Sequence, residues 1–342
     1  MIDFTPQEFQ QKYDEIKELE TALTHPSSTP TVYILGGQPG AGKTSIQTDL
    51  TQSNSDIIII NADSYRQHHP HFELIQAQHG DDSPKYTQPF INAVTERLID
   101  ELSTEQYNLI VEGTLRTAEV PLKTAKELKE KGYRTELCVM AVKPEISYES
   151  TILRYENAIA FGETPRATSK AHHDMVVERI AANLDTIHQS GVFDCISIYT
   201  RDKGCIYSSD TSNQKPSDVE KSILFGEWSA YEKNNLRDIV QQVRLLKQNR
   251  NAEDLAKYLS HSNALLKQIG ISTDTEQLLK KSNLSGEQIT ALSSAPIKFT
   301  AQKTGIDTYC IVFQKSDLDN INLVLSSLSA KNKTEQPPKP KR

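Results

Sequence analysis

Residues 37–44 read Gly-Gln-Pro-Gly-Ala-Gly-Lys-Thr, which is the spacing of a phosphate-binding P-loop. An apolar run at 32–35 precedes them and a helix-compatible run follows, as the motif requires. Glycines let successive backbone N–H groups close around an anion, and the N-terminus of the next helix adds partial positive charge. The pattern therefore predicts nucleoside triphosphate binding, with Lys43 on the β- and γ-phosphates and the Thr44 hydroxyl on Mg²⁺. The residues expected to contact the nucleotide are Gly37, Gln38, Pro39, Gly40, Ala41, Gly42, Lys43, Thr44 and Ser45.

A carboxylate follows the next apolar run. The isoleucines 57–60 lead into Asn61-Ala62-Asp63, which sets Asp63 at the carboxyl edge of a predicted strand. An Asp at this edge can accept the proton of an attacking hydroxyl or hold Mg²⁺, and both roles suit phosphoryl transfer. The alternative is that Asp63 only caps the following helix.

A third apolar run, 107–111, ends in the same way, with Glu112-Gly113-Thr114-Leu115-Arg116. Glu112 and Thr114 offer hydrogen bonds to a polyhydroxylated acceptor, and Arg116 can grip a diphosphate bidentately. Further along the chain, Arg154 and Arg166 stand where guanidinium groups would neutralise charge on a transferred phosphoryl group. The alternative for 112–116 is a strand-end turn with a solvated salt bridge. The alternative for Arg154 and Arg166 is that they are ordinary exposed arginines on helices.

The elements that must position these residues alternate along the chain. Apolar strand-like runs occupy 32–35, 57–60, 107–111, 134–142 and 195–200, and helical patterns separate them at 88–102, 121–131 and 145–160. Near-continuous apolar strands between helices are typical of βαβ units around a buried parallel sheet. We therefore predict an α/β fold with a mostly parallel sheet, covered by helices on both faces, and the ligand at the carboxyl ends of the strands. A P-loop alone does not separate a kinase from a GTPase, a motor or a helicase.

Composition changes after about residue 214, so we expect a kinase domain at 1–214 that folds alone and an accessory helical or α+β region at 215–330. Within the accessory region, 297–302 and 308–314 resemble a pair of strands, and a closing helix follows them. The tail at 331–342 is basic and proline-rich, which predicts disorder.

Composition also excludes several classes of protein. The formal net charge of −7 argues against nucleic acid or an anionic membrane as the main partner. We find no signal-peptide pattern and no apolar run long enough to span a bilayer. The four scattered cysteines predict reduced thiols in a cytoplasmic protein, and the histidines show no zinc-ligand spacing.

Several segments, in their amino-acid sequence and in their order along the chain, resemble the zeta toxin family of bacterial toxin–antitoxin pairs. The resemblance spans roughly residues 1–210, through GGQPGAGKTS, NADSYRQHHPHF, YNLIVEGTLRTAEVPLKTA, KGYRTELCVMAVKPEISYESTILRYE and PRATSKAHHD. It implies a three-layer α/β/α P-loop kinase fold. It also implies an enzyme that uses ATP and Mg²⁺ to phosphorylate the 3′-hydroxyl of the amino-sugar of UDP-N-acetylglucosamine, which blocks cell-wall precursor synthesis. It also implies a small helical antitoxin that covers the nucleotide site.

Carried over by position, the resemblance gives each of these residues a role. Lys43 and Thr44 match the phosphate and Mg²⁺ positions, and Asp63 matches the general base. The substrate-binding positions fall on Glu96, Glu112, Thr114, Arg116 and Thr124, and the ATP-clamping arginines on Arg154 and Arg166. The chain departs from the family pattern at Leu115, where glycine is expected, and at Asn61, where an acidic residue is expected; a bulky Leu115 would change which UDP-sugar fits.

Two other functions remain open at this point. One is a small-molecule or antibiotic phosphotransferase on the same scaffold, which growth arrest and the phosphorylated metabolite would distinguish from a toxin. The other is a non-catalytic module that binds ATP and engages a partner through 215–330. Such a module would bind ATP without transferring phosphate to any UDP-sugar.

Overall fold

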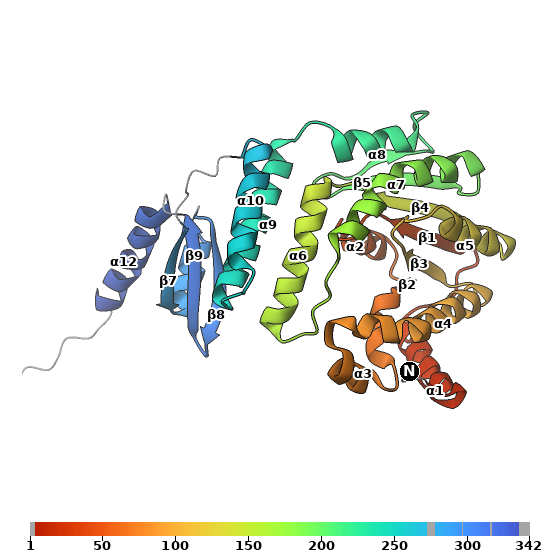
Figure 1. Ribbon diagram of the computed structural model, residues 1–342, viewed down its shortest axis with the longest axis horizontal. Helices are drawn as coiled ribbons and strands as arrows, with labels where there is room; N and C mark the ends of the chain where they lie inside the picture. Colours follow the sequence, from red (N-terminus) through yellow and green to blue (C-terminus); the bar gives the residue numbers. More distant parts are fainter. Residues whose placement is uncertain (1–3, 272–277, 296, 315–316, 335–342) are drawn as a thin grey trace, which may run out of the picture. The chain divides into compact units, whose positions relative to one another are not determined.

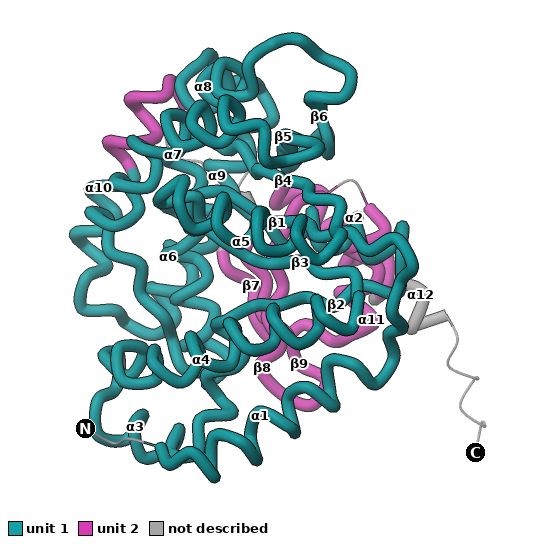
Figure 2. The backbone as a smooth tube through the Cα atoms, turned by 90° about the vertical axis from the view of Figure 1, so that its right-hand side faces the viewer, with its two compact units in different colours: residues 1–262 teal, residues 263–342 magenta. Residues whose placement is uncertain are grey.

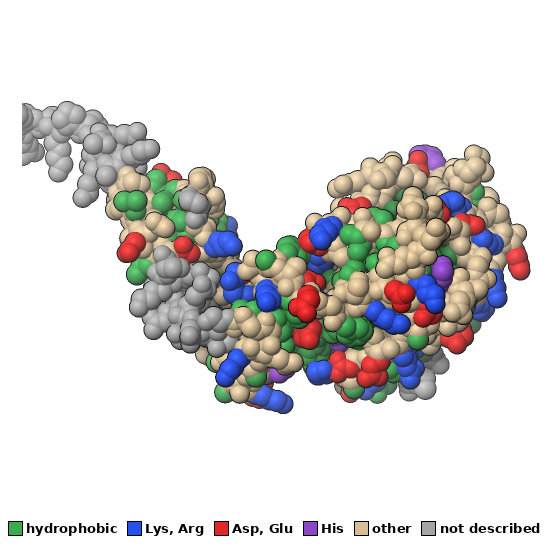
Figure 3. Space-filling model, turned by 90° about the horizontal axis from the view of Figure 1, so that it is seen from above, with side chains coloured by type: hydrophobic (Ala, Val, Ile, Leu, Met, Phe, Trp, Pro, Cys, Tyr) green, Lys and Arg blue, Asp and Glu red, His purple; other side chains and the backbone are tan. Residues whose placement is uncertain are grey.

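The computed structural model describes residues 4–271, 278–295, 297–314 and 317–334. The chain forms two compact units, Met1–Ser262 and Asn263–Arg342 (Figure 2). In the first unit, Lys and Arg side chains are interspersed with Asp and Glu over the face shown in Figure 3.

The first unit is built on one sheet of six strands in the order β2-β3-β1-β4-β5-β6 (Figure 1). The first five strands pair in parallel and β6 pairs antiparallel with β5. This arrangement confirms the predicted mostly parallel α/β fold, although β6 was not predicted. The strands are β1 (Thr31–Gly36), β2 (Ile57–Ile60), β3 (Asn108–Glu112), β4 (Arg134–Met140), β5 (Cys195–Thr200) and β6 (Gly204–Ser208).

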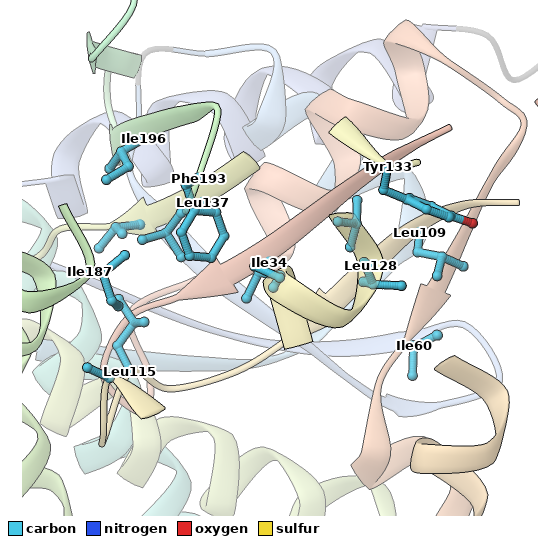
Figure 4. Close-up of a cluster of buried hydrophobic side chains, with 14 of the residues drawn as sticks. Ile34, Ile60, Leu109, Leu115, Leu128, Tyr133, Leu137, Ile187, Phe193 and Ile196 are labelled. Carbon is cyan, nitrogen blue, oxygen red and sulfur yellow. The ribbon is translucent and has the colours of Figure 1, made fainter. Parts of the chain in front are cut away.

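Successive residues of a strand point to opposite faces of the sheet. Because both sets are largely apolar here, helices cover both faces. Side chains such as Ile34 and Leu137 pack with α1, α4, α5, α7 and α8 in the larger core cluster, part of which is shown in Figure 4. Leu35 and Met140 point to the other face, where Ile46 of α2 covers them. The helices named so far are α1 (Pro6–Thr21), α2 (Thr44–Ser53), α4 (Ser83–Thr104), α5 (Glu119–Glu130), α7 (Lys170–Ser190) and α8 (Pro216–Phe225).

The remaining elements of this unit lie at the carboxyl edge of the sheet or beyond it. A 3₁₀ segment, η1 (Ala62–His68), follows β2, and α6 (Pro144–Phe161) follows β4. Helix α9 (Ala230–Asn249) packs along α6 (Figure 1). The other elements are α3 (Phe72–His79) and η2 (Gly80–Asp82), and α10 (Leu255–Gln268) begins in this unit and continues past its last residue, Ser262. None of the helices in the described part of the chain has the length and apolar character needed to cross a bilayer.

The first unit continues well past residue 214. Leu224 of α8 is buried in the larger core cluster, and the Nζ atom of Lys143 donates to the Gly226 carbonyl at 2.6 Å. The same Nζ atom lies 5.7 Å from the ring centre of Trp228. The domain boundary expected near residue 214 therefore lies inside this compact unit.

The second unit contains an antiparallel sheet of three strands in the order β7-β9-β8. The predicted pairing of two strands is confirmed by β8 (Phe299–Gly305) and β9 (Thr308–Gln314), whereas β7 (Leu278–Leu284) was not predicted. Helices α11 (Gly286–Ser293) and α12 (Leu318–Thr334) supply core residues such as Leu292 and Ile321. Helix α12 includes the first residues of the tail for which disorder was predicted; 335–342 lie outside the described residues.

Candidate active site

The P-loop leaves the carboxyl end of β1 at the middle of the sheet and enters α2. Gly37, Gly40 and Gly42 have φ angles of +137°, +76° and +97°, which side-chain-bearing residues rarely adopt. A Cβ on Gly40 would also overlap the carbonyl oxygen of Ser147 on α6. The glycine spacing of the sequence is therefore required both by the turn of the loop and by the close approach of α6.

One P-loop residue points inward and anchors the loop. The side chain of Gln38 is fully buried, and its Nε2 donates to the Val142 carbonyl at 2.7 Å and to Ser147 Oγ at 3.3 Å. Ser147 Oγ lies 2.8 Å from Nε2 of His173, whose Nδ1 lies 3.2 Å from Asp174 Oδ1. Burial lowers the pKa of His173, which favours the neutral ring, whose Nε2 can accept a hydrogen bond from Ser147. Gln38 was predicted to contact the nucleotide, but its side chain holds the loop in place.

A second anchor, Arg201, was missed by the sequence analysis. Arg201 follows β5, and its Nε donates to the Ala41 carbonyl at 2.9 Å while its Nη2 donates to the Gly40 carbonyl. The same guanidinium donates to Ser150 Oγ at 3.0 Å and to Asn235 Oδ1 at 3.2 Å. The rule that drew attention to Asp63, a polar residue at the carboxyl end of a parallel strand, would also have found Arg201.

Lys43 is buried at the base of the loop, 8% exposed. Its Nζ lies 3.4 Å from the Gly37 carbonyl oxygen and 3.5 Å from Oε1 of Glu112, the last residue of β3. Burial lowers the pKa of Lys43, the Glu112 carboxylate acts against this, and the charges of Arg154 and Arg166 lower the pKa further. These three cations converge on one place, which suits the binding of a polyphosphate.

Asp63 lies on η1, where the Asn61 side chain caps the segment by accepting from the Asp63 N–H at 3.1 Å. Its carboxylate is held by two arginines: Arg66 at 3.1 Å and Arg166, which pairs with the other oxygen. Arg66 is itself fixed by the Pro84 carbonyl and Thr87 Oγ1 of α4, at 2.9 and 2.8 Å. Asp63 therefore sits in a defined position, with Arg166 as an exposed and replaceable partner.

The structure brings together part of the predicted site. Asp63, Lys43, Glu112, Arg154 and Arg166 form one cluster, because Arg166 pairs with Asp63 and both arginines act on Lys43. Arg154 also interacts with Glu112 and donates to Thr168 Oγ1 at 3.3 Å, beside Arg166 in the α6–α7 loop. Thr44 and Ser45 are exposed at the start of α2. Within the described ranges, four other predicted residues make no side-chain hydrogen bond or ion pair: Glu96, Thr114, Arg116 and Thr124.

Leu115 does not have the orientation that its position near Thr114 suggested. Its side chain is 4% exposed and belongs to the larger core cluster (Figure 4), where it fills the space beside Gly36. Its φ angle is +54°, in the left-handed region, and its carbonyl accepts from Asn183 Nδ2 at 2.8 Å. Leu115 therefore fixes the turn after β3 through the core.

Arg201, which anchors the P-loop, also lines a pocket of about 450 Å³. The pocket lies between the ends of β4 and β5 and the segment that joins α8 to α9, with Val142, Ile223 and Asn235 among its lining residues. Thr200 Oγ1 also lines it, buried and without a hydrogen-bond partner among the described residues. Its walls combine apolar side chains with six charged ones: Lys143, Arg201, Asp202, Lys203, Glu227 and Glu232.

A P-loop on the central strand of a mostly parallel sheet, with carboxylates and arginines at the neighbouring strand ends, defines a P-loop phosphotransferase. Comparison with known proteins specifies the family. The zeta toxin family model matches residues 14–212. Toxin PezT of Streptococcus pneumoniae serotype 4 is 41% identical over 237 residues, which cover 69% of this chain and 94% of PezT. Toxin zeta of Streptococcus pyogenes is 39% identical over 228 residues, 65% of this chain and 79% of that protein.

Solved structures agree with this assignment. A structure from the PezAT chromosomal toxin–antitoxin system of S. pneumoniae has a TM-score of 0.68 at 38% identity and covers 72% of this chain and 99% of its own. The AvrRxo1-ORF1:-ORF2 complex with ATP has a TM-score of 0.53 at 14% identity and covers 76% of this chain and 89% of its own. At this low identity the similarity shows only that the fold is shared. The chain belongs to the zeta toxin family. It is thus a kinase-type toxin of the toxin–antitoxin class.

Proposed function

We propose that this protein transfers the γ-phosphoryl group of ATP to the 3′-hydroxyl of the amino-sugar of UDP-N-acetylglucosamine or a related UDP-sugar. The observation that supports it best is the cluster of Asp63, Lys43, Glu112, Arg154 and Arg166 at the carboxyl edge of the sheet. The cluster joins a carboxylate that can act as a base to cations that can hold phosphates. Phosphoryl transfer needs this combination and little else.

The residues present fit ATP and Mg²⁺. The positive φ angles of Gly37, Gly40 and Gly42 let the loop turn its backbone into a cradle for phosphates. Thr44 is exposed at the first turn of α2, where its hydroxyl can ligate a metal ion. When bound, ATP supplies the phosphoryl group and Mg²⁺ neutralises its charge. Lys43, Arg154 and Arg166 would hold the phosphate oxygens, and Arg154 and Arg166 would stabilise the charge that develops during transfer.

Asp63 is proposed as the general base. In the structure Arg166 occupies one of its oxygens, so an acceptor hydroxyl and a phosphate must together draw Arg166 away. Both side chains of this pair are 46% exposed, and exposed ion pairs are weak, about 0–1 kcal/mol. Releasing Arg166 from Asp63 therefore costs little free energy. Arg66, which is 13% exposed, keeps Asp63 in place while Arg166 moves to the phosphate.

The pocket beside Arg201 is proposed to receive the nucleoside part of ATP. Arg201 lines this pocket and also donates to the carbonyls of Gly40 and Ala41, so it connects the pocket with the P-loop. The unpaired Thr200 hydroxyl and the Asn235 amide offer hydrogen bonds to a heterocyclic base, while Val142 and Ile223 offer apolar contact.

The cellular role we propose is that of a bacterial cytoplasmic toxin that depletes a cell-wall precursor and is restrained by an antitoxin over its nucleotide site. The support is the similarity to toxin PezT and to the PezAT toxin–antitoxin structure. Glu96, Glu112, Thr114, Arg116 and Thr124 are proposed to bind the UDP-sugar.

The direct test is incubation of the full chain with ATP, Mg²⁺ and a panel of UDP-sugars, followed by phosphorus NMR of the products. We expect a new phosphomonoester on the sugar of UDP-N-acetylglucosamine or a close analogue. Transfer only to a small molecule outside the panel would favour an antibiotic or metabolite kinase. ATP binding without transfer to any acceptor would indicate a non-catalytic binding module and would overturn the proposal.

A further inference from the structure

Helix α6 faces the phosphate loop with one stripe of residues. Ser147, Ser150, Thr151 and Arg154 follow the spacing i, i+3, i+4, i+7, which places them on one face. The Ser147 carbonyl and the Thr151 methyl fill the space that a Cβ on Gly40 would need, and Ser150 Oγ accepts from Arg201. Arg154 ends the stripe beside Lys43 and Glu112. The position of α6 therefore sets both the wall behind Gly40 and the position of Arg154.

The same helix carries two carboxylates that are hidden from water. Glu149 and Glu156 are 0% and 1% exposed, and they lie seven positions apart, so they share a face about two helical turns long. Their positions interleave with those of the stripe that faces the P-loop. Two buried carboxylates on a surface helix need a specific set of partners.

Those partners come from α9 and α10, between residues 247 and 261. Arg250 donates to both oxygens of Glu156, at 2.7 and 2.9 Å, and Lys247 Nζ lies 2.8 Å from Oε1. About two helical turns away along α6, Tyr258 donates to Glu149 Oε2 at 2.6 Å, and His261 Nε2 lies 3.4 Å from Oε1 of the same carboxylate. Burial raises the pKa of Glu149, and the hydrogen bond from the Tyr258 hydroxyl and the charge of His261 oppose this rise.

Such contacts determine geometry more than net stability. The cost of removing two charges from water can equal or exceed the attraction that is gained, so a buried ion pair adds little by itself. A bidentate arginine–carboxylate pair, however, fixes both the distance and the plane of its partner. Anchors at Glu149 and at Glu156 together fix the rotation of α6 about its axis and its position along that axis.

We propose that the segment 247–261 is a positioning element of the kinase site: by holding Glu156 through Arg250 and Lys247, and Glu149 through Tyr258, it sets the position of Arg154 and of the Gly40 wall. The segment lies beyond residue 212, where the match to the family model ends. The inference deepens the proposed function and rests on it for the role of Arg154. Arg250 acts here through Glu156 and Arg154, without touching the substrates.

The test is a double-mutant cycle in the full chain between Arg250→Ala and Arg154→Ala, with Lys257→Ala as the matched control. Lys257 is an exposed cation of the same segment. We expect Arg250→Ala to lower kcat by ~10-fold or more with a smaller change in KM, since a displacement of about 1 Å at a catalytic group can cost ~10²-fold. Arg154→Ala should then cost a smaller factor in the Arg250→Ala background than in the wild type. Wild-type kcat in Arg250→Ala, or factors that multiply in the double variant, would overturn the inference.

Two further arms keep the test decisive. If Arg250→Ala does not fold, Arg250→Lys, which keeps the charge but loses the bidentate geometry, replaces it in the same cycle. Hydrogen exchange of α6 and of residues 37–43 is measured in parallel, because it needs no turnover. Faster exchange in the arginine variant than in Lys257→Ala supports the inference, and equal exchange overturns it. A wild-type protein that transfers no phosphate overturns the proposed function instead, and the exchange arm still tests the positioning role.

Discussion

The two halves of the candidate site are built in different ways. The nucleotide half is a glycine loop fixed from below by buried groups, with Gln38, Arg201 and Ser147 holding its backbone. The acceptor half consists of exposed side chains: Asp63 pairs with Arg166, and Glu96 and Arg116 make no side-chain hydrogen bond or ion pair within the described residues. The phosphate site is therefore formed before any ligand binds, whereas the acceptor site requires at least Arg166 to move.

The difference has a physical basis. A backbone cradle needs a single φ/ψ solution, which glycines and buried hydrogen bonds can fix locally. Acceptor recognition relies on long side chains from several segments, and ordering each of them costs rotamer entropy until a ligand supplies partners. Closure on substrate also excludes water from the transfer. The following predictions test how far the two halves can be separated.

The largest effect is expected from truncation. A fragment ending at residue 214 removes Leu224 from the core and uncovers the face of α6 that carries Glu149 and Glu156. The loss of one buried leucine side chain alone typically costs about 2–5 kcal/mol, a large part of a typical total stability. We expect the 1–214 fragment to aggregate or to melt without cooperativity, and the 1–262 fragment to melt cooperatively. A 1–214 fragment with full activity would restore the boundary expected from composition.

The next effect concerns the base of the nucleotide half. Lys43→Ala should lower phosphoryl transfer by ~10³-fold or more, as expected for a cation on the transferred group, and should remove growth arrest on expression. Lys126→Ala, an exposed lysine of α5, is the control. Growth arrest that persists in Lys43→Ala would show that toxicity does not come from the kinase reaction.

A smaller effect should separate the two halves. Arg154→Ala and Arg166→Ala are each expected to lower kcat by ~10²–10³-fold, because they act on charge that develops during transfer. Their KM for ATP should change much less, since the preformed loop and Lys43 still bind the nucleotide. An unchanged kcat with a raised KM would make both arginines ground-state ligands of ATP.

The smallest effect lies outside both halves and tests the fold alone. Glu220 of α8 is fully buried, neither of its oxygens has a partner among the described residues, and burial raises its pKa to about 8. Its stabilising contribution is therefore complete below the unfolded pKa of 4.5 and is lost as pH rises through about 8. Between pH 6 and 7, urea unfolding should show a loss of up to about 1.4 kcal/mol. Glu220→Gln should remove this slope and leave kcat unchanged; an equal slope in the variant would assign it to another group.

The same contrast explains what the sequence could predict. Gly40 and Lys43 lie within one short motif, and Asp63 and Glu112 follow from the rule that parallel strands end at one edge. The inward orientation of Gln38 and Leu115 depends on α6 and on the core, which no local spacing encodes. Strand β6 is short and partly exposed, so it lacks a clear apolar pattern. The Glu156–Arg250 pair joins residues 94 positions apart. A change of composition near residue 214 therefore does not locate the end of the first compact unit, which is Ser262.

The most direct test of the whole account is ATP affinity and turnover in Asp63→Asn, with Asp14→Asn as an exposed control on α1. Calorimetry should show ATP binding within a few-fold of the wild type, while phosphoryl transfer to the UDP-sugar falls by ~10²–10⁴-fold, the usual cost of losing a general base. This result would show a preformed nucleotide half and a base that belongs to the acceptor half. Wild-type turnover in Asp63→Asn, or a loss of ATP affinity as large as the loss of turnover, would contradict the account.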